Sequence, residues 1–75
     1  MEGFIKGLIP GKHYGFIIDP ATRKEYFFHK QDFSGHWDDL QDDMNRHFEI
    51  KVAFDIVDSP KGPRASRVKR LDFPN

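Results

Sequence analysis

Aromatic rings alternate along two short segments between Lys12 and His29, and this alternation limits the possible folds of the chain more than any other feature of its sequence. Successive side chains of a β-strand point to opposite faces. Tyr14 and Phe16 therefore share one face of a strand, and Phe27 and His29 share one face of the next. If the opposite faces form the core, four rings stand in water. A contiguous exposed patch of this kind usually marks a binding site.

Three further segments read as strands. Residues 4–9 have Ile5 as the best core candidate and Lys6 on the outer face. The clearest alternation places five apolar side chains on one buried face: Phe48, Ile50, Val52, Phe54 and Ile56. Residues 65–71 form the last strand. Together with residues 13–18 and 25–29, which form a hairpin, these segments predict five short strands separated by Pro and Gly breakers.

The long connection between the third and fourth strands loses the alternation. Within it, Trp37, Leu40 and Met44 are spaced for one face of a short helical turn. Five short strands with one long connection predict an all-β fold, a small antiparallel barrel. Closing the sheet also removes the edges that a short β-protein would otherwise expose.

Composition supports one small domain. The chain has 75 residues and no cysteine, so its core is small and no disulfide or thiolate site can reinforce it. We assign residues 1–71 to the domain and residues 72–75 to a frayed tail. No apolar run approaches the length of a membrane span, and the N-terminus does not resemble a signal peptide. We therefore expect a soluble, cytoplasmic chain.

The exposed rings and their neighbouring cations favour a nucleic-acid partner. The formal net charge is zero, but residues 61–70 are rich in Lys and Arg and contain no acid. Unpaired bases stack on aromatic side chains while cations follow the phosphates. The cations interleaved with the rings are Lys6, Lys12, Lys30, Lys61 and Arg64. The alternative is a protein-interaction barrel that uses the same rings for a polypeptide.

Other functions have little support in the residues. No serine lies in a nucleophile elbow, and no glycine-rich loop could cradle a nucleotide phosphate. The histidines match no local ligand pattern, and the aspartates of residues 38–43 lack the pattern of an EF-hand loop. We expect neither an enzyme nor a metal, cofactor, membrane or small-molecule partner.

The chain resembles the cold shock domain family over nearly its whole length. Lys12-His13-Tyr14-Gly15-Phe16-Ile17 is similar to the family motif K-G-F-G-F-I, and Tyr26-Phe27-Phe28-His29-Lys30 resembles V-F-V-H-F. The opening Gly3, Ile5 and Lys6 match the start of the family pattern. Trp37-Asp38-Asp39-Leu40 is similar to F-x-x-L, and residues 62–68 match G-P-x-A-x-x-V.

The resemblance implies a five-stranded OB-fold barrel that binds single-stranded RNA or DNA with loose sequence preference. It carries over Tyr14, Phe16, Phe27 and His29 as base-stacking residues and Trp37 as a further ring on a loop. Lys6 and Lys12 are carried over as contacts to phosphates or base edges. The family suggests an RNA chaperone or a regulator of transcription or translation. A monomer is expected, with a strand-exchanged dimer as the alternative.

The departures from the family pattern predict a smaller platform. Gly7-Leu8 stands where the family usually has two rings, and Lys30 replaces the last phenylalanine of the second motif. Asp38 sits where a lysine is common and repels phosphate locally. Residues 41–48 are longer than the usual link. We therefore expect fewer stacked bases and weaker affinity for a long strand.

Overall fold

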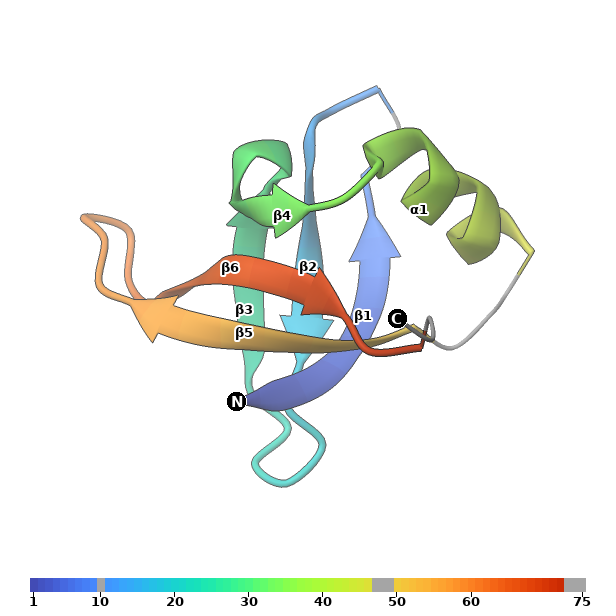
Figure 1. The fold of residues 1–75 in the computed structure, drawn as a ribbon. Helices are drawn as coiled ribbons and strands as arrows, with labels where there is room; N and C mark the ends of the chain where they lie inside the picture. Colours follow the sequence, from blue (N-terminus) through green and yellow to red (C-terminus); the bar gives the residue numbers. More distant parts are fainter. Residues whose placement is uncertain (10, 47–49, 73–75) are drawn as a thin grey trace.

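The computed structural model describes residues 1–9, 11–46 and 50–72 of the chain (Figure 1). Their main strands are β1 (Glu2–Leu8), β2 (Tyr14–Ile18), β3 (Glu25–His29), β5 (Lys51–Val57) and β6 (Arg64–Arg70). A 3₁₀ turn (Lys30–Asp32), the two-residue strand β4 (Phe33–Ser34) and helix α1 (Trp37–Asn45) lie between β3 and β5. No helix in the described ranges is long and apolar enough to cross a membrane.

The strands close into a barrel. Their order is β3-β2-β1-β5-β6-β4, with antiparallel pairing from β3 through to β6. A parallel contact between Phe27 of β3 and Arg64 of β6 closes the circle. Helix α1 lies at one end of this barrel, beside the end of β1 (Figure 1). This confirms the predicted OB-fold and the helical turn within its long connection.

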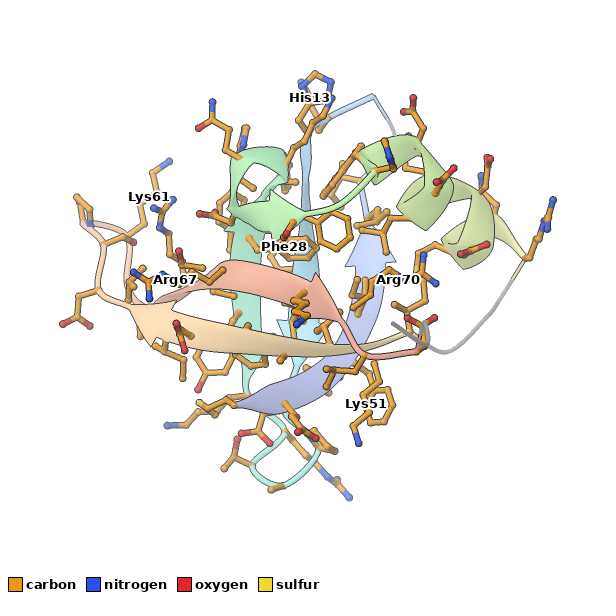
Figure 2. All side chains as sticks on the ribbon, in the orientation of Figure 1. His13, Phe28, Lys51, Lys61, Arg67 and Arg70 are labelled. Carbon is orange, nitrogen blue, oxygen red and sulfur yellow. The ribbon has the colours of Figure 1, made fainter. Side chains whose placement is uncertain are left out.

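The core is formed by the inward faces that the alternation predicts. Ile17, Tyr26 and Phe28 are buried, and Figure 2 shows Phe28 inside the barrel. The other buried apolar residues are Ile5, Phe33, Trp37, Leu40, Ile50, Val52, Phe54, Ala65 and Val68. Because these side chains occupy the interior, their neighbours along β2 and β3 must point outward.

Of the five core residues predicted for the fourth strand, one is exposed and one lies outside the residues that the structure describes. Ile56 was expected in the core, but it is 37% exposed. The register of β5 against β6 shifts between Ala53 and Asp55, and such a bulge turns the following residues away from the interior. Phe48 lies outside the described residues. The observed strands otherwise differ from the predicted bounds by a few residues at their ends.

Helix α1 packs its apolar side against the barrel. Trp37 and Leu40 are buried, and Met44 packs against the core from the same side. Asp38 and Asp39 in the first turn interact favourably with the helix dipole. The sequence spacing of these apolar residues therefore predicts the helix and its single apolar side, and the structure shows that this side faces the barrel.

Arg70 joins α1 to the end of β6. Its side chain is only 8% exposed, and its Nη1 lies 2.8 Å from Asp43 Oδ2. Its Nε donates to Asp72 Oδ1 at 2.8 Å, and its Nη2 donates to Asp72 Oδ2 at 2.5 Å. The hydrogen bond from Arg70 lowers the pKa of the Asp72 carboxyl below its usual value. Although Arg70 belongs to the Lys- and Arg-rich residues 61–70, its charge is used in contacts within the protein, with Asp43 and Asp72.

Gly15 is required by a close approach of two strands. A Cβ at this position would lie 2.6 Å from the carbonyl oxygen of Gly7 and 2.6 Å from Leu8 Cδ2. Gly15→Ala should therefore lower the free energy of unfolding by about 1–3 kcal/mol, because β1 must move. The matched control is Gly7→Ala, whose Cβ would meet nothing within 4 Å. Equal denaturation midpoints for the two variants would contradict this explanation.

Candidate nucleic-acid interface

Four rings cluster on the outer surface of β2 and β3, and we call Tyr14, Phe16, Phe27 and His29 the aromatic face. Tyr14 pairs with His29 and Phe16 pairs with Phe27 across the two strands. The ring centroid of Phe27 lies 5.1 Å from that of Tyr14 and 6.1 Å from that of Phe16. All four side chains are half-buried. Tilted and edge-to-face contacts among Tyr14, Phe16 and Phe27 hold these three rings in place while leaving part of each ring accessible to a ligand.

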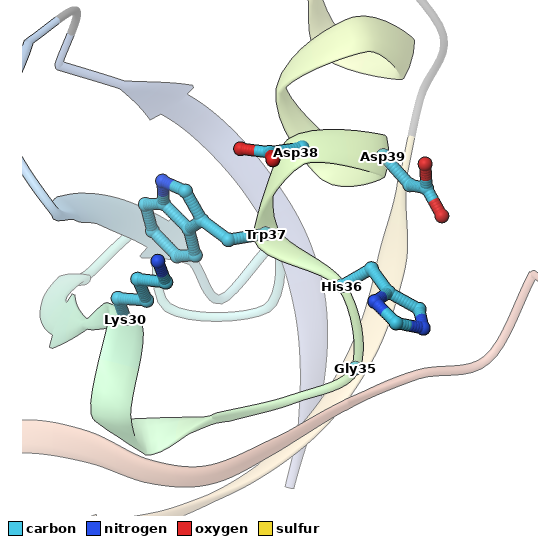
Figure 3. A pocket seen from close by; sticks show the side chains of 6 residues that line it. All are labelled: Lys30, Gly35, His36, Trp37, Asp38 and Asp39. Atoms are coloured by element: carbon cyan, nitrogen blue, oxygen red, sulfur yellow. The ribbon is translucent and has the colours of Figure 1, made fainter.

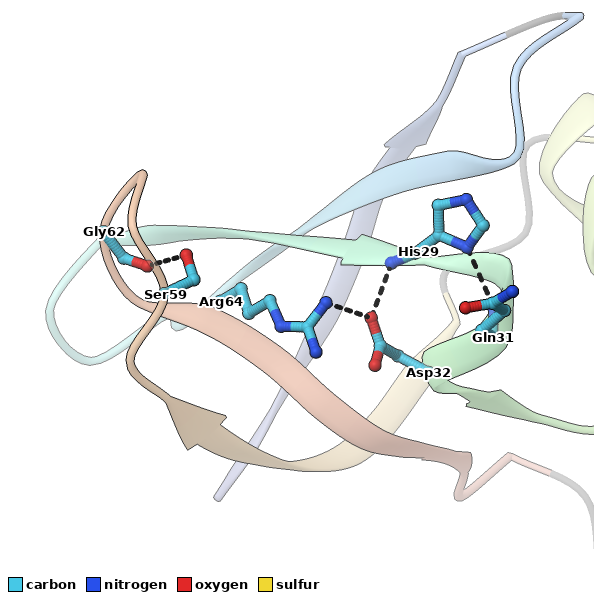
Figure 4. A network of polar contacts seen from close by, with 6 residues as sticks. All are labelled: His29, Gln31, Asp32, Ser59, Gly62 and Arg64. Atoms are coloured by element: carbon cyan, nitrogen blue, oxygen red, sulfur yellow. Dashed lines mark hydrogen bonds and ion pairs between the residues drawn. The ribbon is translucent and has the colours of Figure 1, made fainter.

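The backbone after β3 orients His29 (Figure 4). The Nδ1 atom of its ring accepts a hydrogen bond from the backbone N–H of Gln31 at 3.1 Å. The backbone N–H of His29 donates to Asp32 Oδ2 at 2.9 Å, which completes a capping box on the 3₁₀ turn. Because Nδ1 accepts, the neutral ring carries its proton on Nε2. His29 thus adds a hydrogen-bond donor to one end of the aromatic face.

The predicted cations fall into two groups. Lys6 Nζ lies 2.5 Å from Glu25 Oε2, and Arg64 Nη1 lies 3.5 Å from Asp32 Oδ2. The charges of Lys6 and Arg64 are therefore partly balanced by these carboxylates. The other predicted cations make no ion pair with any described residue: Lys12, Lys30 and Lys61. These lysines have charge available for a phosphate.

A hollow of about 670 Å³ adjoins the aromatic face. Tyr14 and Phe27 form one side, and the loop between β5 and β6 forms the other with Pro60 and Pro63. Hydrogen bonds between Ser59 and Gly62 hold this loop in a turn, including Ser59 Oγ to the Gly62 carbonyl at 2.5 Å (Figure 4). Lys61 and Arg64 also line the hollow. An apolar floor beside cations suits a base with its phosphate.

Trp37 was expected to be an exposed ring on a loop, and that expectation is wrong. The side chain is 4% exposed, and its ring packs edge-on against Phe28 at 5.7 Å and Phe33 at 6.1 Å. Trp37 begins α1, whose packing on the barrel turns the ring inward. Figure 3 shows it between the helix and Lys30, at a hollow of about 520 Å³. The ring belongs to the core rather than to the aromatic face.

The departures from the family pattern leave a gap in the outer surface. Gly7 pairs with Phe16, so a row runs from Gly7 through Phe16 to Phe27 across three strands. The place of the first ring in this row is empty, because a Cβ at Gly7 would have open space around it. Leu8 instead packs against the core. The aromatic face therefore ends at Phe16 on this side.

Some residues of the site were not predicted from the sequence. Gln31 and Asp32 orient His29, and Pro60 and Pro63 line the hollow. The breakers of residues 58–63 indicated a turn, but nothing local indicated that it would fold beside Tyr14 and Phe27. That proximity comes from closure of the barrel between β3 and β6.

A small barrel of five main strands is the architecture of OB-fold proteins. The sequence comparisons agree with this class. Residues 1–71 match the family described as "'Cold-shock' DNA-binding domain". A cold shock-like protein of Aquifex aeolicus (strain VF5) is 33% identical over 70 residues, which cover 93% of each chain. The chain belongs to the cold shock domain family, a family of nucleic-acid-binding domains.

Proposed function

We propose that this protein binds single-stranded RNA or DNA with loose sequence preference, by stacking bases on the aromatic face. The observation that carries the proposal is the cluster of Tyr14, Phe16 and Phe27, with ring centroids 5.1–6.2 Å apart on the outside of the barrel. Every base has a face that can stack on such rings, which explains a binding mode tolerant of sequence. His29 extends the surface and adds an N–H donor.

The basic residues around the rings contribute unequally to phosphate contact. Lys12, Lys30 and Lys61 surround the rings with charge that no described carboxylate balances, so they contact the phosphates directly. Lys6 and Arg64 contribute after their contacts with Glu25 and Asp32 rearrange. Because two family rings are missing at Gly7 and Leu8, the protein covers few bases and binds a long strand weakly.

The cellular role that follows is that of an RNA chaperone or a regulator of transcription or translation. A protein that binds unpaired segments shifts a hairpin toward its open form by mass action. This action needs no nucleotide hydrolysis. Such a role also explains why loose sequence preference is useful.

The proposal is tested by titrating a fluorescein-labelled heptathymidine with the protein and recording fluorescence anisotropy over a range of salt concentrations. The label belongs on the DNA, since Trp37 is buried and does not report stacking directly. Affinity should fall as salt rises, as expected when a protein displaces counterions from phosphates. No binding at low salt by folded protein would refute the proposal and favour a polypeptide partner for the aromatic face.

Lys12→Ala should reduce the salt dependence of this binding. Loss of one phosphate contact lowers the slope of log affinity against log salt by about 0.7 for a single strand. The matched control is Lys51→Ala, because Lys51 lies away from the aromatic face and pairs with Glu2 at 3.2 Å. If both variants kept the slope of the wild type, Lys12 would not contact phosphate.

A further inference from the structure

A separate hollow of about 370 Å³ lies between the end of β1 and helix α1. Gly7 and Leu8 line it from the barrel, and Gln41, Asp42 and Asn45 line it from the helix. Its volume is within the range of small-ligand sites. It is distinct from the hollow beside Tyr14 and Phe27, which lies against the loop between β5 and β6.

This hollow continues the path of the aromatic face. Gly7 lies directly across from Phe16 in the pairing of β1 with β2. Apart from its chain neighbours, no heavy atom lies within 4 Å of where a Cβ at Gly7 would be, so there is open space on this side of the strand. A strand with one base on Phe16 can therefore place the next base over Gly7. There the base edge faces α1.

The helix presents unused hydrogen-bonding groups to that edge. Gln41 and Asn45 are four residues apart, so they are neighbours on one side of α1. Within residues 1–9, 11–46 and 50–72, the side chains of Gln41, Asp42 and Asn45 make no hydrogen bond or ion pair. The next aspartate, Asp43, is by contrast held by Arg70.

We infer that the hollow between Gly7 and α1 is a subsite for one base that bears an exocyclic amine, with adenine preferred to thymine or uracil. The inference rests on the proposed binding of single strands. A side-chain amide matches the donor and acceptor edge of adenine. The Asp42 carboxylate only accepts hydrogen bonds, so it suits an amine. The single N–H of thymine lies between two carbonyl oxygens, which a carboxylate repels.

The charges around the hollow agree with this orientation of the nucleotide. Lys12 follows Gly11, which lines the hollow on the barrel side, and Lys12 has no ion pair with a described residue. A phosphate placed toward Lys12 lies on the barrel side of the site. The base edge then points toward the carboxylate of Asp42, and the phosphate stays away from it.

The test compares heptathymidine with seven probes in which one thymidine is replaced by deoxyadenosine, each measured by anisotropy at one low salt concentration. The probe that carries deoxyadenosine at one particular position should bind about 5- to 10-fold more tightly than heptathymidine, which is the lower part of the range for base-edge contacts. In Gln41→Ala/Asn45→Ala this gain should disappear while heptathymidine binds as before. Alanine favours a helix, so the double variant should remain folded.

Asp42→Asn supplies an independent measurement. This variant should reduce the difference in affinity between the preferred deoxyadenosine probe and heptathymidine. The main change should be tighter binding of heptathymidine, because the amide does not repel the thymine carbonyls. The matched control is Asp39→Asn, which makes the same change of charge on α1 outside this hollow. This control should change the affinity of every probe by the same factor.

The possible results distinguish a failure of the proposed subsite from a failure of the proposed function. If the protein bound all eight probes equally, the subsite would be refuted and single-strand binding would stand. A positional preference that survived in Gln41→Ala/Asn45→Ala would also refute it, since adenine would then be read elsewhere. If folded protein bound no probe, both the subsite and the proposed function would be refuted.

Discussion

Replacing Arg70 with methionine should lower the free energy of unfolding by about 2–3 kcal/mol. Removing one partner of a buried ion pair costs about 3–5 kcal/mol, and partial exposure of Asp43 and Asp72 reduces that value. In a domain of this size the loss corresponds to a fall of about 10–20 °C in Tm. Methionine retains the packing of the long side chain, so the loss reports mainly on the ionic contacts.

A matched control and a pH series make this prediction specific. Lys51→Met removes an exposed ion pair with Glu2 and should change stability by less than about 1 kcal/mol. Arg70 lowers the pKa of Asp72 in the folded protein, so the stabilisation is present at neutral pH and lost as pH falls through the folded pKa. The difference in free energy of unfolding between the wild type and Arg70→Met should therefore become smaller below about pH 4. Equal stability of the two proteins at pH 7 would contradict the role of Arg70.

Replacing Phe16 or Phe27 with alanine should weaken the binding of heptathymidine by about 1–3 kcal/mol for each ring, which is about 5- to 150-fold. Each ring offers a stacking surface on the outer face and is only half-buried. The measurement is the anisotropy titration at constant salt. Because the salt slope depends on phosphate contacts, it should stay as in the wild type.

Two variants distinguish lost stacking from lost folding. Phe27→Leu keeps an apolar side chain beside Tyr14 and Phe16 but removes the stacking surface of the Phe27 ring. This variant should therefore fold, and it should bind heptathymidine more weakly than the wild type. Leu71→Ala removes an exposed apolar side chain away from the aromatic face and should leave affinity unchanged. If Phe16→Ala and Phe27→Ala both bound within twofold of the wild type while remaining folded, base stacking on these rings would be refuted.

The strands and the outward rings could be predicted because they depend on local alternation. Once Ile17 and Phe28 pack inward, Phe16 and Phe27 must point outward, whatever the rest of the chain does. The spacing of Trp37 and Leu40 similarly predicts a helical turn with one apolar side. It does not say whether that side faces the barrel or a ligand, and the expectation for Trp37 failed at this step.

Features that join distant segments could not be read from the sequence. The bulge in β5 that exposes Ile56 depends on its register with β6. Whether Arg70 faces solvent or an aspartate depends on where α1 packs against the barrel, because Asp43 lies on this helix. The same docking of α1 beside Gly7 creates the hollow that we assign to an amine-bearing base.

The barrel, its family and the rings of the aromatic face could be predicted from the amino-acid sequence alone, because period-two alternation and contiguous motifs are properties of neighbouring residues. Which rings and charges remain available to a ligand depends on the tertiary structure. Packing of α1 buried Trp37, ion pairs engaged Lys6 and Arg64, and barrel closure placed the loop of residues 58–63 beside Tyr14 and Phe27. These outcomes depend on contacts between segments far apart in the chain, which local patterns do not specify.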